Sequence, residues 1–275
     1  MLAITGATGA VGGRVARALA TDFRHDLRLV VRDPARAADF DTDIRGCEYA
    51  DHAAAMAALT DVDTLFMVSA AEAVDRRDQH RTFIRAAADA GVGHIVYTSF
   101  AGAAPDATFT LGRDHWDAEQ AIRESGMRFT FLRDNFYSDL LPYFADASGV
   151  IRGPAGDGRV AAVARADVAD VATAVLRAPA DHADATYVLT GPEALTLSEV
   201  AARTGKTFEN ETVDEAYASR RAAYPEAEDW QLDAWVSTYT AIRDGSCAAV
   251  TGDVERVSGH PARTLEEALQ ESGRS

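Results

Sequence analysis

The first residues in the chain that could do chemistry are three regularly spaced glycines. Gly6, Gly9 and Gly12 follow a short apolar segment and open a stretch with helical periodicity. In such a context the first glycine permits a tight turn, the second a close approach of the backbone, and the third close packing of helix on strand. Because a helix N-terminus presents free amide groups and a partial positive charge, the loop predicts a site for the pyrophosphate of a dinucleotide. The predicted contacts are Gly6, Thr8, Gly9, Val11 and Gly12.

Two arginines follow the second apolar segment, where dinucleotide-binding proteins distinguish the adenosine ribose. Arg32 comes directly after residues 27–31, and Arg36 lies about one helical turn later. Guanidinium groups pair well with a 2′-phosphate, whereas an acidic residue in this region accepts hydrogen bonds from a free ribose hydroxyl. Asp33 is therefore the competing signal for NAD. We interpret the two arginines as favouring NADP(H).

Other candidate site residues follow the ends of further predicted strands. Ligands of open α/β sheets bind beyond the carboxyl ends of the strands. We expect Asp51 near the adenine, and a second group beside the ribose and nicotinamide: Val68, Ser69, Ser99 and Phe100. Asn135 and Tyr137 are expected at the nicotinamide end or at the substrate. A flat substrate could meet an aromatic wall of Phe100, Trp116, Phe136 and Tyr137, although aromatic residues at such spacings are more often part of the core.

These residues require a particular order of strands and helices to position them. Apolar runs at 2–5, 27–31, 47–50, 64–68, 94–98 and 128–132 alternate with helical patterns at 11–20, 76–90 and 114–124. Apolar strands separated by helices are typical of a buried parallel sheet. The sequence therefore predicts an α/β fold with a doubly wound, Rossmann-type parallel sheet. A helix at 168–176, a strand at 186–190 and a helix capped by Ser198 are expected to follow.

The chain is expected to divide into two parts after residue 133. Residues 1–133 would form the core NADP-binding Rossmann domain. Residues 134–275 would form a substrate lobe interleaved with the last strand and helices of the Rossmann sheet. From Asp214 onward the pattern is mostly helical and includes Trp230, Trp235 and Tyr239. We therefore expect a small, mostly helical C-terminal lobe over the carboxyl edge of the sheet.

Composition restricts the classes of partner. The formal net charge of −16 repels phosphate backbones and anionic lipid surfaces, so direct nucleic-acid binding is not expected. No apolar run approaches a membrane span and no leader segment precedes the first strand, so we expect a cytoplasmic protein without a membrane partner. Cys47 and Cys247 lack metal-type or redox spacing, and the 7 histidines are scattered, so no metal site is predicted.

Several segments together resemble one known family across nearly the whole chain. They are Gly-Ala-Thr-Gly-x-x-Gly at 6–12, Val-Val-Arg-Asp-Pro at 30–34, Tyr-Thr-Ser at 97–99, His-Trp-Asp-Ala-Glu at 115–119, Leu-Arg-Asp-Asn-Phe-Tyr at 132–137 and Leu-Thr-Gly-Pro-Glu-Ala-Leu at 189–195. This set resembles the NmrA-like branch of the atypical short-chain dehydrogenases/reductases, particularly its bacterial NAD(P)H:quinone oxidoreductases. The opening loop is widely shared, whereas the later segments point to the branch.

The proton-transfer dyad of ordinary short-chain reductases is absent. None of the 8 tyrosines has a lysine four residues later, and Lys206 is the only lysine. The resemblance places the proton-handling position at His115, and a histidine can donate a proton near neutral pH. Ala118 stands where relatives often have threonine. An alternative interpretation is equally open: His115 lines the cleft from its helix and has no catalytic role, because water could protonate a reduced quinone.

Two functions remain open on this basis. The first is an NADPH-dependent oxidoreductase that transfers hydride to a quinone-like or conjugated carbonyl acceptor, with a small molecule as its partner and His115 and Tyr137 as candidate catalytic residues. The second is a non-catalytic NADP(H)-binding redox sensor, since the resemblance includes NmrA-type regulatory proteins and a fold does not fix a function. The sequence leaves the acceptor open and is compatible with a homodimer.

Overall fold

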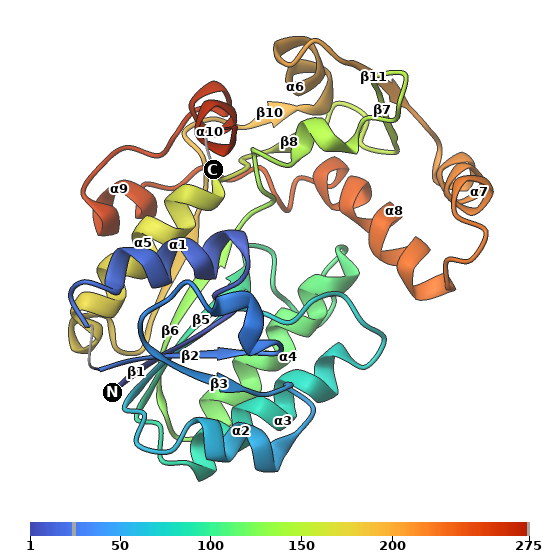
Figure 1. The fold of residues 1–275 in the computed structure, drawn as a ribbon. Coiled ribbons are helices and arrows are strands. Elements are labelled where there is room, and N and C mark those ends of the chain that lie inside the picture. The colour runs from blue at the N-terminus through green and yellow to red at the C-terminus, as the bar shows by residue number, and fades with distance from the viewer. Residues whose placement is uncertain (24–25, 274–275) are drawn as a thin grey trace.

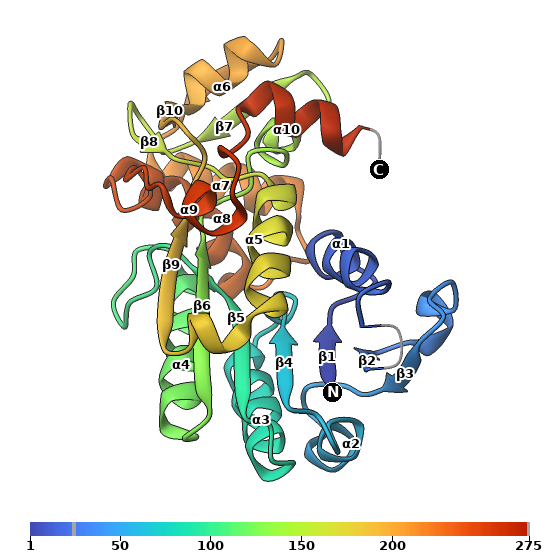
Figure 2. The same cartoon turned by 90° about the vertical axis from the view of Figure 1, so that its left-hand side faces the viewer.

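Seven parallel strands form the central sheet of the computed structural model, which describes residues 1–23 and 26–273. Their order is β3-β2-β1-β4-β5-β6-β9, as Figure 2 shows. The strands are β1 (Leu2–Thr5), β2 (Leu27–Val31), β3 (Asp43–Gly46), β4 (Thr64–Met67), β5 (His94–Phe100), β6 (Arg128–Asp134) and β9 (Ala185–Leu189). The chain builds outward from β1 to β3, returns to place β4 beside β1, and continues outward on the other side. This reversal between β1 and β4 is where doubly wound sheets bind ligands.

Helices cover both faces of the sheet (Figure 1). One face carries α1 (Ala10–Leu19), α5 (Arg165–Arg177) and α9 (Asp253–Ser258), and the other carries α2 (His52–Ala58), α3 (Arg76–Asp89) and α4 (Thr110–Glu124). Because successive strand residues point to opposite faces, Ile4 and Val96 pack under the first helix layer, whereas Ala3 and Ile95 pack under the second. Both faces are therefore buried, which explains the nearly continuous apolar strands.

The remaining elements form a lobe beyond the carboxyl ends of the strands, as both views show. Two small sheets organise it, one pairing β7 with β11 and the other pairing β8 with β10. The elements are η2 (Leu141–Phe144), β7 (Val150–Gly153), β8 (Arg159–Val160), β10 (Leu195–Thr196), α6 (Leu197–Arg203), β11 (Thr207–Asn210), α7 (Val213–Ala223), α8 (Asp229–Arg243) and α10 (Leu265–Ser272). Two short 3-10 helices lie nearer the core, η1 (Pro34–Ala37) and η3 (Pro179–His182). Phe100 and Leu141 join the core of this lobe to the sheet.

The predicted fold class is confirmed, and two local predictions are wrong. The third strand occupies 43–46 rather than 47–50, because an exposed edge strand needs no apolar run and Cys47 already begins the turn into α2. The cap of α6 is Thr196 rather than Ser198. The Thr196 hydroxyl accepts from the Glu199 amide at 3.1 Å, and the Glu199 carboxylate accepts from the Thr196 amide.

Among the described helices, none combines the length and the apolar character that a membrane span requires.

Candidate functional site

The glycine loop between β1 and α1 has the geometry of an anion cradle. Gly6 has φ +63°, a conformation that favours glycine, and its carbonyl accepts from the Gly9 amide at 2.9 Å. A Cβ added to Gly12 would lie 2.4 Å from the Gly6 oxygen, so only glycine allows α1 to pack this closely. Gly9 precedes the helix without a side-chain cap, which leaves the first amides of α1 free to bind a phosphate.

A cavity of about 570 Å³ opens beside this loop, at the switch between β1 and β4. It is lined by most of the predicted cofactor residues: Gly6, Thr8, Gly9, Arg32, Arg36, Val68 and Ser69. Val11 and Gly12 lie behind the loop, where the Val11 side chain packs in the core. The lining also includes residues that the sequence reasoning missed, namely Glu48, Tyr49, Ala50 and the segment 70–73. They follow β3 and β4, so their position beyond strand ends was the available signal.

The two arginines and the competing aspartate are used differently. Arg32 and Arg36 are exposed on the cavity, and within the described chain neither side chain has a hydrogen bond or an ion pair. Asp33 caps η1 by accepting from the Ala35 amide at 3.1 Å. Its carboxylate is therefore occupied by the backbone, whereas both guanidinium groups remain available for a phosphate.

Three other residues were predicted to bind the cofactor through their side chains. In the structure these side chains make hydrogen bonds within the fold instead. Asp51 caps α2 through its bond to the Ala54 amide, 3.0 Å, and does not line the cavity. Ser99 is fully buried and donates to Glu119 at 2.6 Å, on the face of the sheet that carries α4. Asn135 donates to the Cys247 carbonyl at 2.9 Å and accepts from the Phe136 amide at 2.8 Å. None of these three residues lines the cavity, and their roles at the cofactor stay predictions.

His115 belongs to a buried hydrogen-bonded network rather than to an open cleft wall. Arg76 donates to His115 Nε2 at 3.1 Å, so a neutral ring carries its proton on Nδ1, 3.1 Å from the Tyr97 hydroxyl oxygen. Burial, with the Arg76 charge second, holds the pKa of His115 well below its ordinary value. A neutral histidine with both nitrogens engaged is poorly placed to donate a proton, so its catalytic role stays a prediction.

The same network fixes the backbone that follows β4. Arg76 Nε donates to the Ala70 carbonyl at 2.9 Å, and His80 Nε2 accepts from the Ala70 amide at 2.9 Å. Burial lowers the pKa of His80 to about 3, so this ring is neutral and can accept that bond. Ala70 is therefore held on both sides, and the loop after β4 keeps its place on the cavity wall.

Tyr137 forms a pair with Asp134 at the carboxyl end of β6. The Tyr137 hydroxyl donates to Asp134 Oδ2 at 2.7 Å. Burial raises the pKa of Asp134 to about 7, and burial together with the Asp134 charge raises the pKa of Tyr137 well above its ordinary value. Tyr137 is thus a neutral phenol near neutral pH, and its proposed part in the reaction remains a prediction.

A second cavity, of about 650 Å³, lies between the sheet and the lobe. Aromatic side chains dominate its wall: Phe109, Phe136, Tyr143, Phe144, Tyr224, Trp235 and Tyr239. Of the predicted aromatic wall, Phe136 lines this cavity, and the Phe100 ring lies behind it at a centroid distance of 5.1 Å. Glu72 lines both this cavity and the first one, so the two spaces adjoin at the loop after β4.

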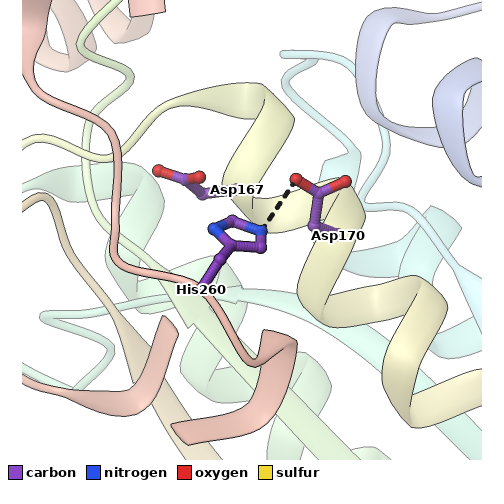
Figure 3. Close-up of side chains that lie close together, drawn as sticks. All are labelled: Asp167, Asp170 and His260. Atoms are coloured by element: carbon purple, nitrogen blue, oxygen red, sulfur yellow. Dashed lines mark hydrogen bonds and ion pairs between the residues drawn. The ribbon is translucent and has the colours of Figure 1, made fainter. Parts of the chain in front are cut away.

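Asp167, Asp170 and His260 form a cluster elsewhere that resembles a ligand set, with ligand atoms within 4.8 Å of one another (Figure 3). His260 Nε2 lies 3.2 Å from an oxygen of Asp170. Arg263 donates to both carboxylates, at 2.8 Å in the case of Asp170. The guanidinium group of Arg263 thus neutralises the carboxylates where a metal ion would otherwise do so. These ion pairs attach the segment before α10 to α5.

Comparison with known proteins agrees with this geometry. A family model described as NAD(P)H-binding matches residues 6–179. Quinone oxidoreductase 2 of Escherichia coli is 34% identical over 283 residues, covering 98% of this chain and 97% of the relative. A (4-alkanoyl-5-oxo-2,5-dihydrofuran-3-yl)methyl phosphate reductase of Streptomyces griseus is 35% identical, covering 97% and 96%.

Structural similarity extends over the same length. The crystal structure of the Escherichia coli NADPH-dependent quinone oxidoreductase complexed with NADPH superposes with a TM-score of 0.88 at 32% identity, covering 99% of this chain and all of that one. An NmrA-like family domain-containing oxidoreductase of Aspergillus flavus is 29% identical over 74% of this chain and 70% of its own length. The chain belongs to the NAD(P)H-binding family, in the NmrA-like branch of the atypical short-chain dehydrogenases/reductases.

Proposed function

We propose that this protein is an NADPH-dependent oxidoreductase that reduces a quinone-like or other conjugated carbonyl acceptor. The observation that carries the proposal is the contact between two cavities, one beside the glycine loop and one walled by aromatic rings, which share Glu72. A redox sensor needs the first cavity, whereas a reductase needs both. Two relatives support the acceptor class, because one is named for quinones and the other for a dihydrofuranone, an unsaturated lactone.

The residues of the first cavity fit the proposed cofactor. The free amides at the start of α1 would bind the pyrophosphate, and Arg32 and Arg36 would bind the 2′-phosphate. The tight contact between Gly12 and Gly6 leaves the loop surface clear of side chains at this point. When bound, NADPH supplies the hydride, and the protein supplies position and surroundings.

The second cavity would hold the acceptor. Phe136, Tyr143 and Trp235 would surround a flat conjugated molecule with aromatic rings and limit its contact with water. The buried network around His115 presents no free proton donor, so water would protonate the oxyanion that hydride addition leaves on a quinone. On this proposal the chain accelerates the reaction chiefly by aligning two bound rings.

Steady-state kinetics test the proposal with NADPH, NADH and a panel of small quinones and unsaturated lactones. We expect turnover with neutral quinones and a higher kcat/KM for NADPH than for NADH. Tyr143→Ala should raise the KM for the quinone several-fold and leave the Kd for NADPH unchanged, because Tyr143 is 75% exposed and lines only the acceptor cavity.

Met56→Ala is the matched control, since Met56 is an exposed apolar side chain of α2 outside both cavities. We expect this variant to match the unmodified protein in both measurements. Tight NADPH binding without turnover of any acceptor would refute the reductase and support the redox sensor.

A further inference from the structure

The charged side chains around the acceptor cavity are not equally available to a bound molecule. Arg152 donates to Asp146 and, at 2.9 Å, to Glu209. Arg220 donates to Glu211 at 2.5 Å, and its guanidinium carbon lies 5.0 Å from the centre of the Tyr239 ring. Carboxylates therefore already pair with both arginines that line the cavity, and neither offers a free positive charge to an acceptor.

Glu72 is the opposite case. It is exposed, lines both cavities, and has no hydrogen bond or ion pair to any other residue in the described ranges. The backbone beside it is held at Ala70 by Arg76 and His80, so the carboxylate is carried by a fixed segment rather than a loose one. An uncompensated negative charge thus stands where an acceptor would approach the cofactor.

We propose that Glu72 makes the acceptor site selective by charge, favouring flat, delocalised organic cations and opposing anionic acceptors. The inference rests on the proposed function and adds the acceptor's charge to it. Two features of the cavity support the same class. The rings of Tyr143 and Trp235 line the cavity, and aromatic rings attract cations through their quadrupoles; the Tyr239 ring is already covered by Arg220. A carboxylate at the junction adds an attraction that is weakly screened at low salt.

The reduction of such acceptors also needs no proton from His115. Hydride transfer breaks a C–H bond of the dihydronicotinamide and delivers two electrons and one hydrogen nucleus. Addition of that hydride to an acceptor of charge +1 forms a new bond to hydrogen and gives a neutral reduced dye, so no proton is needed. A quinone instead becomes a hydroquinone anion that takes its proton from water. The reduction of a cationic acceptor is therefore not slowed by the buried, neutral state of His115.

Three acceptors of different charge test the inference under anaerobic conditions and saturating NADPH. They are methylene blue as the cation, 2-methyl-1,4-naphthoquinone as the neutral molecule, and 1,2-naphthoquinone-4-sulfonate as the anion. For Glu72→Gln we expect kcat/KM to fall about 5-fold with the cation and rise about 3-fold with the anion, while the neutral quinone changes less than twofold. Glu72→Lys should enlarge both changes, and 0.5 M salt should reduce them.

Glu48→Gln is the matched control, because Glu48 is an exposed carboxylate that lines the cofactor cavity but not the acceptor cavity. Its removal should affect all three acceptors alike. Equal changes for the three acceptors in Glu72→Gln would overturn the charge inference while leaving the proposed function intact. Failure of the unmodified protein to reduce the neutral quinone would instead remove the proposed function itself.

Discussion

Removing Arg32 and Arg36 tests how the site distinguishes NADPH from NADH. Both guanidinium groups are exposed on the cofactor cavity and have no partner among the described residues, so neither must break an existing ion pair to bind a phosphate. A hydrogen bond to a charged group contributes about 1.5–3 kcal/mol when it is sheltered. Because these arginines face water, we take a value just below that range, about 1.4 kcal/mol each, which corresponds to about tenfold in Kd.

Arg32→Ala and Arg36→Ala should each weaken NADPH binding about tenfold, and the double variant about 30- to 100-fold. The Kd for NADH should change less than threefold, since NADH lacks the 2′-phosphate. Direct titration of the intrinsic fluorescence of each nucleotide measures both constants. Raising the ionic strength should reduce the ratio of the Kd for NADH to the Kd for NADPH, and this reduction should be larger in the unmodified protein than in the double variant.

Arg85→Ala is the matched control, because Arg85 is an exposed arginine of α3 that does not line the cavity. It should leave both constants unchanged. An equal loss of affinity for NADPH and NADH would show that the arginines contact a part that the nucleotides share, such as the adenine. That result would refute the assignment of Arg32 and Arg36 to the 2′-phosphate.

Two further substitutions test the packing and the buried charge. Gly12→Ala should destabilise the fold by about 1–3 kcal/mol and weaken binding of both nucleotides in titrations, because the added methyl group would lie 2.4 Å from a backbone oxygen; Gly252→Ala, in open space, should be nearly neutral. Asp134→Asn should gain stability over the unmodified protein as pH rises from 4 to 7. A folded pKa of about 7 against 3.8 unfolded means that the native carboxyl resists ionisation, so the unmodified protein loses up to about 4 kcal/mol in that window. Urea unfolding at pH 4.5, 6 and 7.5 measures this, and parallel stability curves for the two proteins would contradict it.

The parts of the fold that sequence could predict are those fixed by local patterns. The apolar strand Leu2–Thr5, the glycine loop and the helix after it form one continuous segment, and each glycine meets a steric requirement within that segment. The edge strand Asp43–Gly46 escaped prediction because it is partly exposed and alternates polar with apolar residues over only four positions.

Side-chain direction at strand ends was the main limit on the site prediction. Ser99 was predicted at the site because it follows the expected strand at 94–98. It lies within β5 instead, and strand alternation turns it toward α4, where Glu119 also pairs with Arg133 at 2.7 Å. Asn135 faces the segment that contains Cys247, a partner 112 residues away. A short sequence window carries no information about such distant partners.

Apart from Phe136, the wall of the aromatic cavity could not be predicted from the sequence, for a related reason. Its wall joins Phe109 before α4, Phe136 after β6, Tyr143 in η2 and Trp235 in α8, which lie in four separate stretches of chain. Each aromatic residue alone is compatible with ordinary core packing. Only the tertiary arrangement of the lobe over the sheet distinguishes a cavity wall from a core.

The loop after β4 links the buried hydrogen-bonded network to both cavities of the site. His80 and Arg76 hold its backbone through hydrogen bonds to Ala70, and Arg76 Nη2 also donates to His115 Nε2. The network that makes His115 a poor proton donor is therefore the one that keeps Glu72 between the two cavities. The buried polar groups of this site therefore position the loop after β4 and do not transfer protons. This arrangement fits the proposed reaction, in which the protein aligns two bound rings.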